Sequence, residues 1–196
     1  DRLIEELKGR DLGLNIDLGI TGCIGMCYLE PIVDIYDDCG QFHRFTNVKA
    51  EDLNTILEHF DEDVCDEMRI APADEVILDK QVRVVLRNCG VINPESIDDY
   101  IGQGGYTALE SCVRELSQGE VIELIKESGL RGRGGAGFPA WFKWQEARNA
   151  AGTEKYMICN ADEGDPGAFM DRRILEGDPH AVLEGMLIGA YAIGAR

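Results

Sequence analysis

The sequence predicts an α/β chain made of two different regions. In residues 1–62, two short segments with strand patterns precede one amphipathic helix. In residues 93–196, helical segments flank a glycine-rich loop and a short apolar strand. Over residues 63–92 the periodicity weakens and charge rises, which is typical of a linker. We therefore predict two partial domains joined by a linker.

The first region is predicted to end as strand, strand, helix. Residues 30–36 and 41–48 have strand patterns, and the turn-like sequence of residues 37–40 joins them into a hairpin. Residues 50–60 follow, with apolar side chains on one helical face at Leu53, Ile56, Leu57 and Phe60. This order fits the end of a small α/β domain.

The second region is predicted to be mainly helical. We expect strands only at residues 82–86, just before it, and at residues 155–160. Asn93 is suited to cap the first helix, with Pro94 at its first position. The expected helices cover residues 94–101, 106–116, 119–128, about 139–150, and a final segment that Asp178-Pro179 caps.

The composition excludes several classes of partner. Lys and Arg number 19 against 37 Asp and Glu, so the formal net charge is −18. Such an acidic surface repels nucleic-acid phosphates and anionic lipid headgroups. The most apolar stretch, residues 181–195, contains Glu184 and is shorter than the roughly 20 residues that span a bilayer. We therefore expect neither nucleic-acid binding nor direct membrane insertion.

The cysteines and the chain ends indicate the cellular setting. Seven cysteines are many for this length, and an odd number does not suit a closed set of disulfides. The charged start, DRLIEELKGR, does not resemble a signal peptide. A reducing cytoplasm, with thiols kept for metal or redox chemistry, explains both observations. Because there is no starting Met and an apolar helix runs into Arg196, we also expect a fragment of a longer protein.

Cys23 and Cys27 are the candidate metal ligands. Glycine between them allows the chain to bend so that both sulfurs face one metal, and thiolates select zinc or iron–sulfur clusters, which need about four such ligands. Two alternatives stay open: a pair of buried apolar cysteines, or a zinc site that adds His43 or His59. The remaining cysteines are isolated and are more often core residues: Cys39, Cys65, Cys89, Cys112 and Cys159.

The glycine-rich loop of residues 129–137 has the composition of an anion-binding loop. Four glycines fall within residues 132–137, and Arg131 and Arg133 add positive charge. The helix that starts near Pro139 directs its positive end to the same place. The pattern G-x-G-x-x-G is present, but a helix rather than a strand precedes it, so a standard Rossmann site is not expected. A flexible linker is the alternative.

A second loop is acidic and follows the predicted strand at residues 155–160. It offers oxygen acceptors for sugar hydroxyls and for ring N–H groups, from Asn160, Asp162, Glu163 and Asp165. The alternatives are a solvated acidic turn and a calcium loop. The spacing does not match the twelve-residue EF-hand pattern, which disfavours calcium.

Three segments together closely resemble a known family. GLRGRGGAGF, then Lys143-Trp144, then CNADEGDPGAF resemble the flavoprotein subunit of respiratory complex I and the matching subunits of NAD-linked iron-only hydrogenases and formate dehydrogenases. TGCIGMCYLEPIV resembles the second cysteine pair of a thioredoxin-like [2Fe–2S] ferredoxin domain. The resemblance implies the C-terminal part of that ferredoxin domain over residues 1–62 and the first part of an α/β FMN-binding domain over residues 93–196. This fused arrangement looks more like the soluble hydrogenase and formate dehydrogenase subunits.

The resemblance also implies roles for individual residues. Phe138 would stack on a ring of NADH, and Lys143 would approach the flavin or its phosphate. Asp165 would bind dinucleotide hydroxyls, although the family often has Glu there. The family also often differs at Trp141-Phe142, and it often has an aromatic residue where this chain has Glu146. The remaining cofactor-binding residues would be Gly132, Arg133, Gly134, Gly135, Ala136 and Gly137 around both FMN and NADH, and Asn160, Asp162 and Glu163 on the flavin.

The implied activity is an NADH dehydrogenase, or diaphorase, that passes hydride from NADH to FMN and electrons onward to iron–sulfur clusters. No side chain is expected to act as a catalytic acid or base, because the cofactor performs the chemistry. Cys23 and Cys27 would be half of a [2Fe–2S] site, with the other pair before residue 1. A [4Fe–4S] domain would follow Arg196, and the fragment alone would be inactive. The expected partners are NADH and other iron–sulfur subunits; the alternative is a non-flavin electron-transfer or docking subunit.

Overall fold

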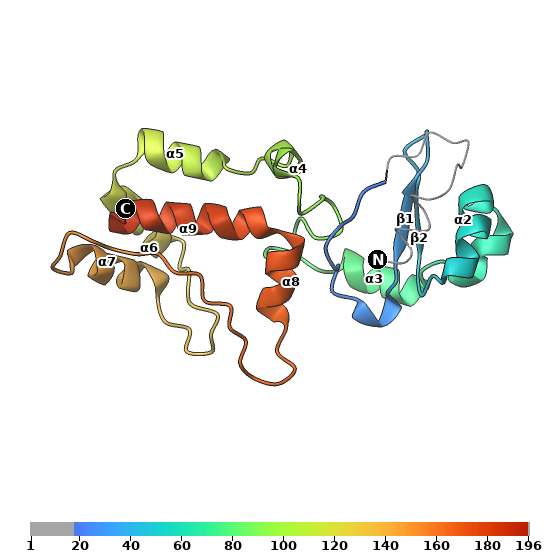
Figure 1. Ribbon diagram of the computed structural model, residues 1–196. Helices are drawn as coiled ribbons and strands as arrows, with labels where there is room; N and C mark the ends of the chain where they lie inside the picture. The colour runs from blue at the N-terminus through green and yellow to red at the C-terminus, as the bar shows by residue number, and fades with distance from the viewer. Residues whose placement is uncertain (1–17, 196) are drawn as a thin grey trace. The chain divides into compact units, whose positions relative to one another are not determined.

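The computed structural model describes residues 18–195, which divide into two compact units (Figure 1). Residues 18–19 and 23–87 belong to the first unit, and residues 20–22 and 88–195 belong to the second. The predicted domains over 1–62 and 93–196 and the predicted linker stay predictions.

The first unit contains a β-hairpin followed by a helix. Strands β1 (Val33–Tyr36) and β2 (Phe42–Phe45) pair antiparallel along their full length. The Asp37 carboxylate closes the turn by accepting hydrogen bonds from two backbone N–H groups, at 2.9 and 2.7 Å. A 3₁₀ turn, η2 (Ala50–Asp52), then leads into α2 (Leu53–His59). The predicted strand, strand, helix order is confirmed.

Two apolar clusters stabilise the first unit. One forms where β2 and α2 meet, and its buried members are Phe45, Val48, Leu53, Ile56 and Cys65. The other consists of the buried residues Ile24, Met26 and Leu29, with Ile32, Ile70 and Leu78 packed against them. Because burying apolar side chains is the main driving force of folding, the second cluster fixes the segment that carries the predicted metal ligands.

The segment predicted as a linker contains ordered structure. It includes η3 (Asp63–Met68) and α3 (Pro72–Asp79), and Cys65 and Leu78 each contribute to one of the two apolar clusters. The predicted strand at residues 82–86 is wrong. Its backbone has no strand partner in the described part of the chain, and Val82 is 92% exposed. A strand needs a neighbour for its backbone hydrogen bonds, and an apolar run alone does not supply one.

The second unit is built around the long helix α9 (Pro179–Ile193), which contacts α5, α6, α7 and α8. Figure 1 shows α9 running between α5 and α7. A core of Val121, Ile122 and Ala192 joins α6 to α9, and the indoles of α7 pack beside it. The other helices of this unit are α4 (Ile97–Gly102), α5 (Thr107–Glu115), α6 (Gln118–Glu127), α7 (Ala140–Asn149) and α8 (Met170–Gly177).

Most of the predicted helices of the second unit are confirmed. The first begins later than expected, because Ser96 rather than Asn93 caps it: the Ser96 hydroxyl accepts a hydrogen bond from the Asp99 N–H at 3.1 Å. Asp178 caps α9 as predicted, accepting from the Ala181 N–H at 3.2 Å. Helix α9 has 15 residues. Within residues 18–195, no helix is both long enough and apolar enough to cross a membrane.

Residues 155–160 do not form the predicted strand. Within residues 18–195 the only strands are β1 and β2, and both belong to the first unit. Residues 155–160 belong to the second unit and have no strand to pair with. Its side chains Tyr156 and Ile158 are exposed. Helix α8, which follows the acidic loop, is a helix that the sequence pattern did not predict.

A buried carboxylate connects α9 to the start of α5. Glu184 is 7% exposed, and its carboxylate accepts hydrogen bonds from the Tyr100 hydroxyl at 2.6 Å and from the backbone N–H groups of Tyr106 at 2.9 Å and Leu109 at 3.1 Å. Tyr106 adopts a positive φ of 62°, a conformation that an ordinary residue keeps only when its surroundings hold it. Glu184 therefore replaces a local cap at the beginning of α5.

Candidate cofactor and metal sites

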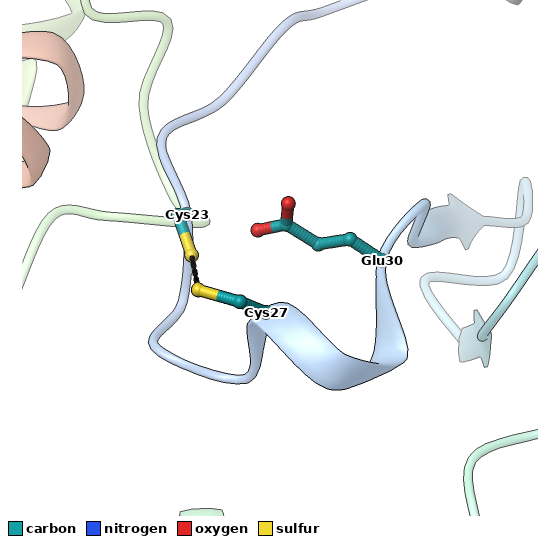
Figure 2. Close-up of side chains that lie close together, drawn as sticks. All are labelled: Cys23, Cys27 and Glu30. Carbon is teal, nitrogen blue, oxygen red and sulfur yellow. Dashed lines mark hydrogen bonds between the residues drawn. The ribbon is translucent and has the colours of Figure 1, made fainter. Parts of the chain in front are cut away.

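The structure brings Cys23 and Cys27 together. Their Sγ atoms are 3.6 Å apart, and η1 (Cys27–Leu29) begins at the second cysteine (Figure 2). Gly25, between them, has a φ of 93°, which favours glycine. Two sulfurs bound to one tetrahedral ion at about 2.3 Å each lie roughly 3.8 Å apart. The observed spacing therefore fits two thiolate ligands of one metal ion.

A third potential ligand, Glu30, lies beside the cysteines and was not predicted. Its carboxylate points towards the two sulfurs (Figure 2), and ligand atoms of the three residues lie within 4.8 Å of one another. The signal in the sequence was an acidic residue three positions after Cys27. Neither His43 nor His59 belongs to this group: the His43 ring lies 3.1 Å from Arg69 Nη1, and the His59 ring lies 3.0 Å from Glu62.

The metal-free thiol of Cys23 is a weak acid in this environment. Burial, and after it the hydrogen bond with the neighbouring Glu30 carboxylate, raise the pKa of Cys23 to about 12, although the backbone N–H of Gly25 lowers it. The thiol therefore keeps its proton at neutral pH. A metal ion must displace that proton to bind, because the thiolate is the ligand.

Arg83, near the C-terminal end of the first unit, holds the cysteine loop. Its Nη2 donates a hydrogen bond to the carbonyl oxygen of Ile24 at 3.1 Å, and Ile24 lies between the two cysteines. Among residues 18–195, the buried Arg83 Nε has no hydrogen-bond partner. No sequence signal identified this contact, because 59 positions separate the two residues.

The glycine-rich loop is closed by backbone hydrogen bonds at its base. The Gly132 N–H donates to the Phe138 carbonyl at 2.8 Å, and the Ala140 N–H donates to the Leu130 carbonyl at 3.0 Å. Arg131 also closes the loop, since its Nη1 donates to the Gly137 carbonyl at 2.8 Å. The loop is therefore an ordered turn between α6 and α7, in contrast to the flexible linker that was the alternative.

The predicted loop residues are exposed and leave open space. Gly135 and Gly137 have φ of 95° and 59°, and a Cβ built on either, or on Gly134, meets nothing within 4 Å. All of residues 131–136 are exposed. Within residues 18–195, Arg133 makes no ion pair. A free cation and exposed backbone N–H groups suit a phosphate at the start of α7.

Phe138 and Lys143 lie together at this loop. The Lys143 Nζ is 5.6 Å from the centroid of the Phe138 ring, and the Phe142 ring contacts Phe138 edge to face at 5.7 Å. Phe138 is 44% exposed. The structure therefore presents an aromatic surface with a cation next to it, beside the glycine loop.

The acidic loop is held in place by Glu163, one of its residues predicted to bind the flavin. Glu163 has a φ of 48°, and its carboxylate accepts hydrogen bonds from the N–H groups of Asp171 at 2.8 Å and Arg172 at 3.1 Å. These N–H groups belong to the first turn of α8, where a carboxylate is favourable. Asp162 and Asp165 are exposed, and the Asn160 amide oxygen accepts from the Asp162 N–H at 3.2 Å.

The two loops extend below the helices in the view of Figure 1, but they are not bonded to each other. Among residues 18–195, no hydrogen bond or ion pair joins residues 129–138 to residues 160–167. A hollow of about 400 Å³ lies elsewhere, along α5, and none of the predicted cofactor residues lines it. Because the glycine loop carries the exposed N–H groups and the cation, the loops and not the hollow form the candidate cofactor site.

Part of the second unit matches a known protein family. Residues 125–196 match the Nuo51 FMN-binding domain, and this segment contains both loops. The chain is also 60% identical over 116 residues to the NADP-reducing hydrogenase subunit HndC of Solidesulfovibrio fructosivorans, covering 59% of this chain and 23% of that protein. It is 53% identical over 113 residues to the NADH-quinone oxidoreductase F 2 subunit of Rhizobium meliloti, covering 58% of this chain and 27% of that one.

A longer match includes the first unit. The chain is 37% identical over 178 residues to the alpha subunit of the NAD-reducing hydrogenase HoxS of Cupriavidus necator, covering 90% of this chain and 28% of that protein. A solved NAD+-reducing [NiFe]-hydrogenase matches 78% of this chain and 25% of its own with 27% identity and a TM-score of 0.44, which is too low to compare folds. The resemblance to these flavoprotein subunits is confirmed, and the chain spans between 23% and 28% of these three relatives.

Proposed function

We propose that this chain is part of an NADH dehydrogenase module that transfers hydride from NADH to FMN and passes electrons to iron–sulfur clusters. The observation that carries the proposal is the match of residues 125–196 to the Nuo51 FMN-binding domain. The relatives are named as NADH-quinone oxidoreductase and NAD(P)-reducing hydrogenase subunits, which supports the same activity. The proposal extends to the whole protein, of which this chain supplies a part.

The glycine loop is proposed to hold phosphate groups. Its exposed backbone and the positive end of α7 provide N–H donors, and Arg133 provides a charge that no carboxylate of the described residues neutralises. Gly132, Gly134, Gly135, Ala136 and Gly137 leave room for close approach because none presents a side chain larger than a methyl group. When bound, FMN supplies the ring that accepts a hydride and releases electrons singly.

Side chains around the loop are proposed to orient the two cofactors. Phe138 offers its exposed ring to the nicotinamide dinucleotide, and Lys143 beside it offers a cation to the flavin phosphate or ring. Asn160 and Asp162 would accept hydrogen bonds from the flavin, and Asp165 from dinucleotide hydroxyls. Glu163 already accepts two backbone hydrogen bonds from α8, so we propose that it fixes the acidic loop as well as facing the flavin.

Cys23 and Cys27 are proposed to supply two of the four thiolates of a [2Fe–2S] cluster. Their 3.6 Å separation fits such a ligand pair, with Cys23 half-buried and Cys27 exposed. The remaining thiolates and a [4Fe–4S] cluster are assigned to the part of the whole protein beyond this chain. We further propose a cytoplasmic location and other iron–sulfur subunits as partners, since all seven cysteines are free thiols and the relatives are named as subunits.

The decisive experiment uses the full-length protein, purified without air and supplied with FMN. Its visible spectrum is recorded before and after NADH is added. We expect a flavin band that bleaches with NADH over a broad iron–sulfur absorption. A folded protein that retains no flavin under these conditions would contradict the proposal and favour an electron-transfer or docking subunit. The 196-residue chain alone is expected to show no NADH oxidation.

A further inference from the structure

Glu30 occupies a fixed position beside the cysteine pair. The residues on either side of it are anchored by backbone hydrogen bonds: the Leu29 carbonyl accepts from the Asn47 N–H at 2.7 Å, and the Pro31 carbonyl accepts from the Val48 N–H at 3.0 Å. Leu29 is also buried in the apolar cluster beneath the loop. The backbone at Glu30 is therefore held in place, and its side chain lies against the sulfurs because of the fold.

The charge of Glu30 is not neutralised by an ion pair in residues 18–195. The cation that reaches this loop, Arg83, directs its Nη2 to the Ile24 carbonyl. The Glu30 side chain is exposed to solvent. When both cysteines bind a metal as thiolates, a further negative charge thus lies within 4.8 Å of the ligand atoms.

We propose that Glu30 is a charge-tuning residue that lowers the reduction potential of the cluster held by Cys23 and Cys27; this rests on the proposed function of that pair. Reduction adds an electron to a centre that is already negative, and a neighbouring negative charge opposes it. Thiolates are the ligands that iron–sulfur clusters prefer, so Glu30 stays outside the cluster. Because the site is exposed to solvent, we expect Glu30 to change the one-electron reduction equilibrium about tenfold. This corresponds to a reduction potential lower by about 59 mV.

The test is a redox titration of the full-length protein, monitored by the electron paramagnetic resonance signal of the reduced [2Fe–2S] cluster. Glu30→Gln keeps the size and hydrogen-bonding capacity of the side chain and removes its charge. Glu51→Gln is the matched control: it changes the net charge equally, but Glu51 is an exposed residue of η2 outside the cysteine group. We expect Glu30→Gln to raise the potential by about 59 mV for a tenfold effect, and Glu51→Gln to leave it unchanged.

A second measurement repeats the titration at increasing salt concentration. Raising the ionic strength screens the Glu30 charge, so the difference between wild type and Glu30→Gln should shrink as salt increases. Equal potentials in the two proteins would overturn the inference while leaving the cluster assignment intact. Loss of the cluster, or a changed resonance spectrum, in Glu30→Gln would identify Glu30 as a ligand and also overturn it. Absence of any [2Fe–2S] signal in the wild type would overturn the proposed function of the cysteine pair and this inference with it.

Discussion

The cysteine loop and the two cofactor loops differ in how they are built. Cys23 and Cys27 are brought to 3.6 Å within one short segment, and the intervening Ile24 and Met26 are buried beneath them. The glycine loop and the acidic loop are each closed by their own hydrogen bonds, but among residues 18–195 none joins one loop to the other. A site within one short loop can form from local contacts, whereas a site shared by two loops needs more of the protein to complete it.

The largest effect should come from removing the local site. Cys23→Ser and Cys27→Ser each withdraw one thiolate from a cluster that needs about four, so we expect complete loss of the [2Fe–2S] signal from the full-length protein. Reduction of the flavin by NADH should continue, because the proposed flavin site lies in the second unit. Iron analysis and stopped-flow flavin bleaching measure the two outcomes separately. Cys39→Ser, at an exposed cysteine outside the metal group, is the control.

If flavin reduction disappeared together with the cluster in both variants, the two sites would not be independent. The contrast between a local site and a composite site would then be wrong.

The next largest effect concerns the glycine loop. Gly135 and Gly134 both leave open space where the methyl group of an alanine would lie, but only Gly135 has a left-handed φ, of 95°. Gly135→Ala should therefore cost about 1–2 kcal/mol of loop stability, from backbone strain alone. We expect FMN affinity of the full-length protein to fall about tenfold, whereas Gly134→Ala should change it by less than about twofold. Fluorescence titration with FMN makes the measurement, and equal affinities in the two variants would argue against this loop conformation.

A smaller effect should follow from the acidic loop. Glu163→Ala removes the carboxylate that accepts two N–H groups of α8, and losing such a cap costs about 1 kcal/mol. Urea unfolding of this chain should show that loss. Asp165→Ala changes an exposed residue of the same loop that does not cap α8, so it should leave stability unchanged while weakening NADH binding by the full-length protein. Equal destabilisation by both variants would show that the Glu163 cap is not what orders this loop.

The sequence predicted the features that depend on neighbouring residues. The β1–β2 hairpin, α5, α6, α7 and α9 follow from apolar spacing and capping residues a few positions apart. The wrong strands, at residues 82–86 and 155–160, are apolar runs whose outcome depends on a partner strand. Helix α8 was not predicted because its cap, Glu163, lies seven positions before its first residue, outside the usual N-cap spacing.

The candidate sites show the same division. The pairing of Cys23 with Cys27 was predictable from their spacing. The composition of the glycine loop left a flexible linker as an alternative, and the hydrogen bonds at its base decide for an ordered turn. The contact of Arg83 with Ile24 was not predictable, because the fold brings together two residues that are far apart in the sequence. In the sequence, Glu184 only interrupts an apolar stretch, and the pattern does not indicate that its carboxylate organises the start of α5 through hydrogen bonds. Contacts between distant positions leave no periodic signal in a single sequence.

The smallest effect concerns α6, the helix that leads into the glycine loop. Ser117 and Glu120 form a capping box: the Glu120 N–H donates to the Ser117 hydroxyl at 3.3 Å, and the Ser117 N–H donates to the Glu120 carboxylate at 2.8 Å. The bond with Ser117 lowers the pKa of Glu120 below its ordinary value of 4.5. The stabilisation is therefore present above the pKa of the unfolded chain and is lost as the pH falls through the lower pKa of the folded chain.

Glu120→Gln removes the negative charge of the capping box and keeps the size of the side chain. Glutamine still accepts the Ser117 N–H bond, so the variant should be slightly less stable than wild type at pH 7 and equal to it in acid below the folded pKa of Glu120. Glu127→Gln, at the last residue of α6, should act in the opposite direction, because a negative charge is unfavourable at a helix C-terminus. Urea unfolding of both variants across this pH range tests the pair. A wild-type advantage over Glu120→Gln that persisted in acid would mean that packing, and not the charge in the capping box, fixes the start of the helix before the glycine loop.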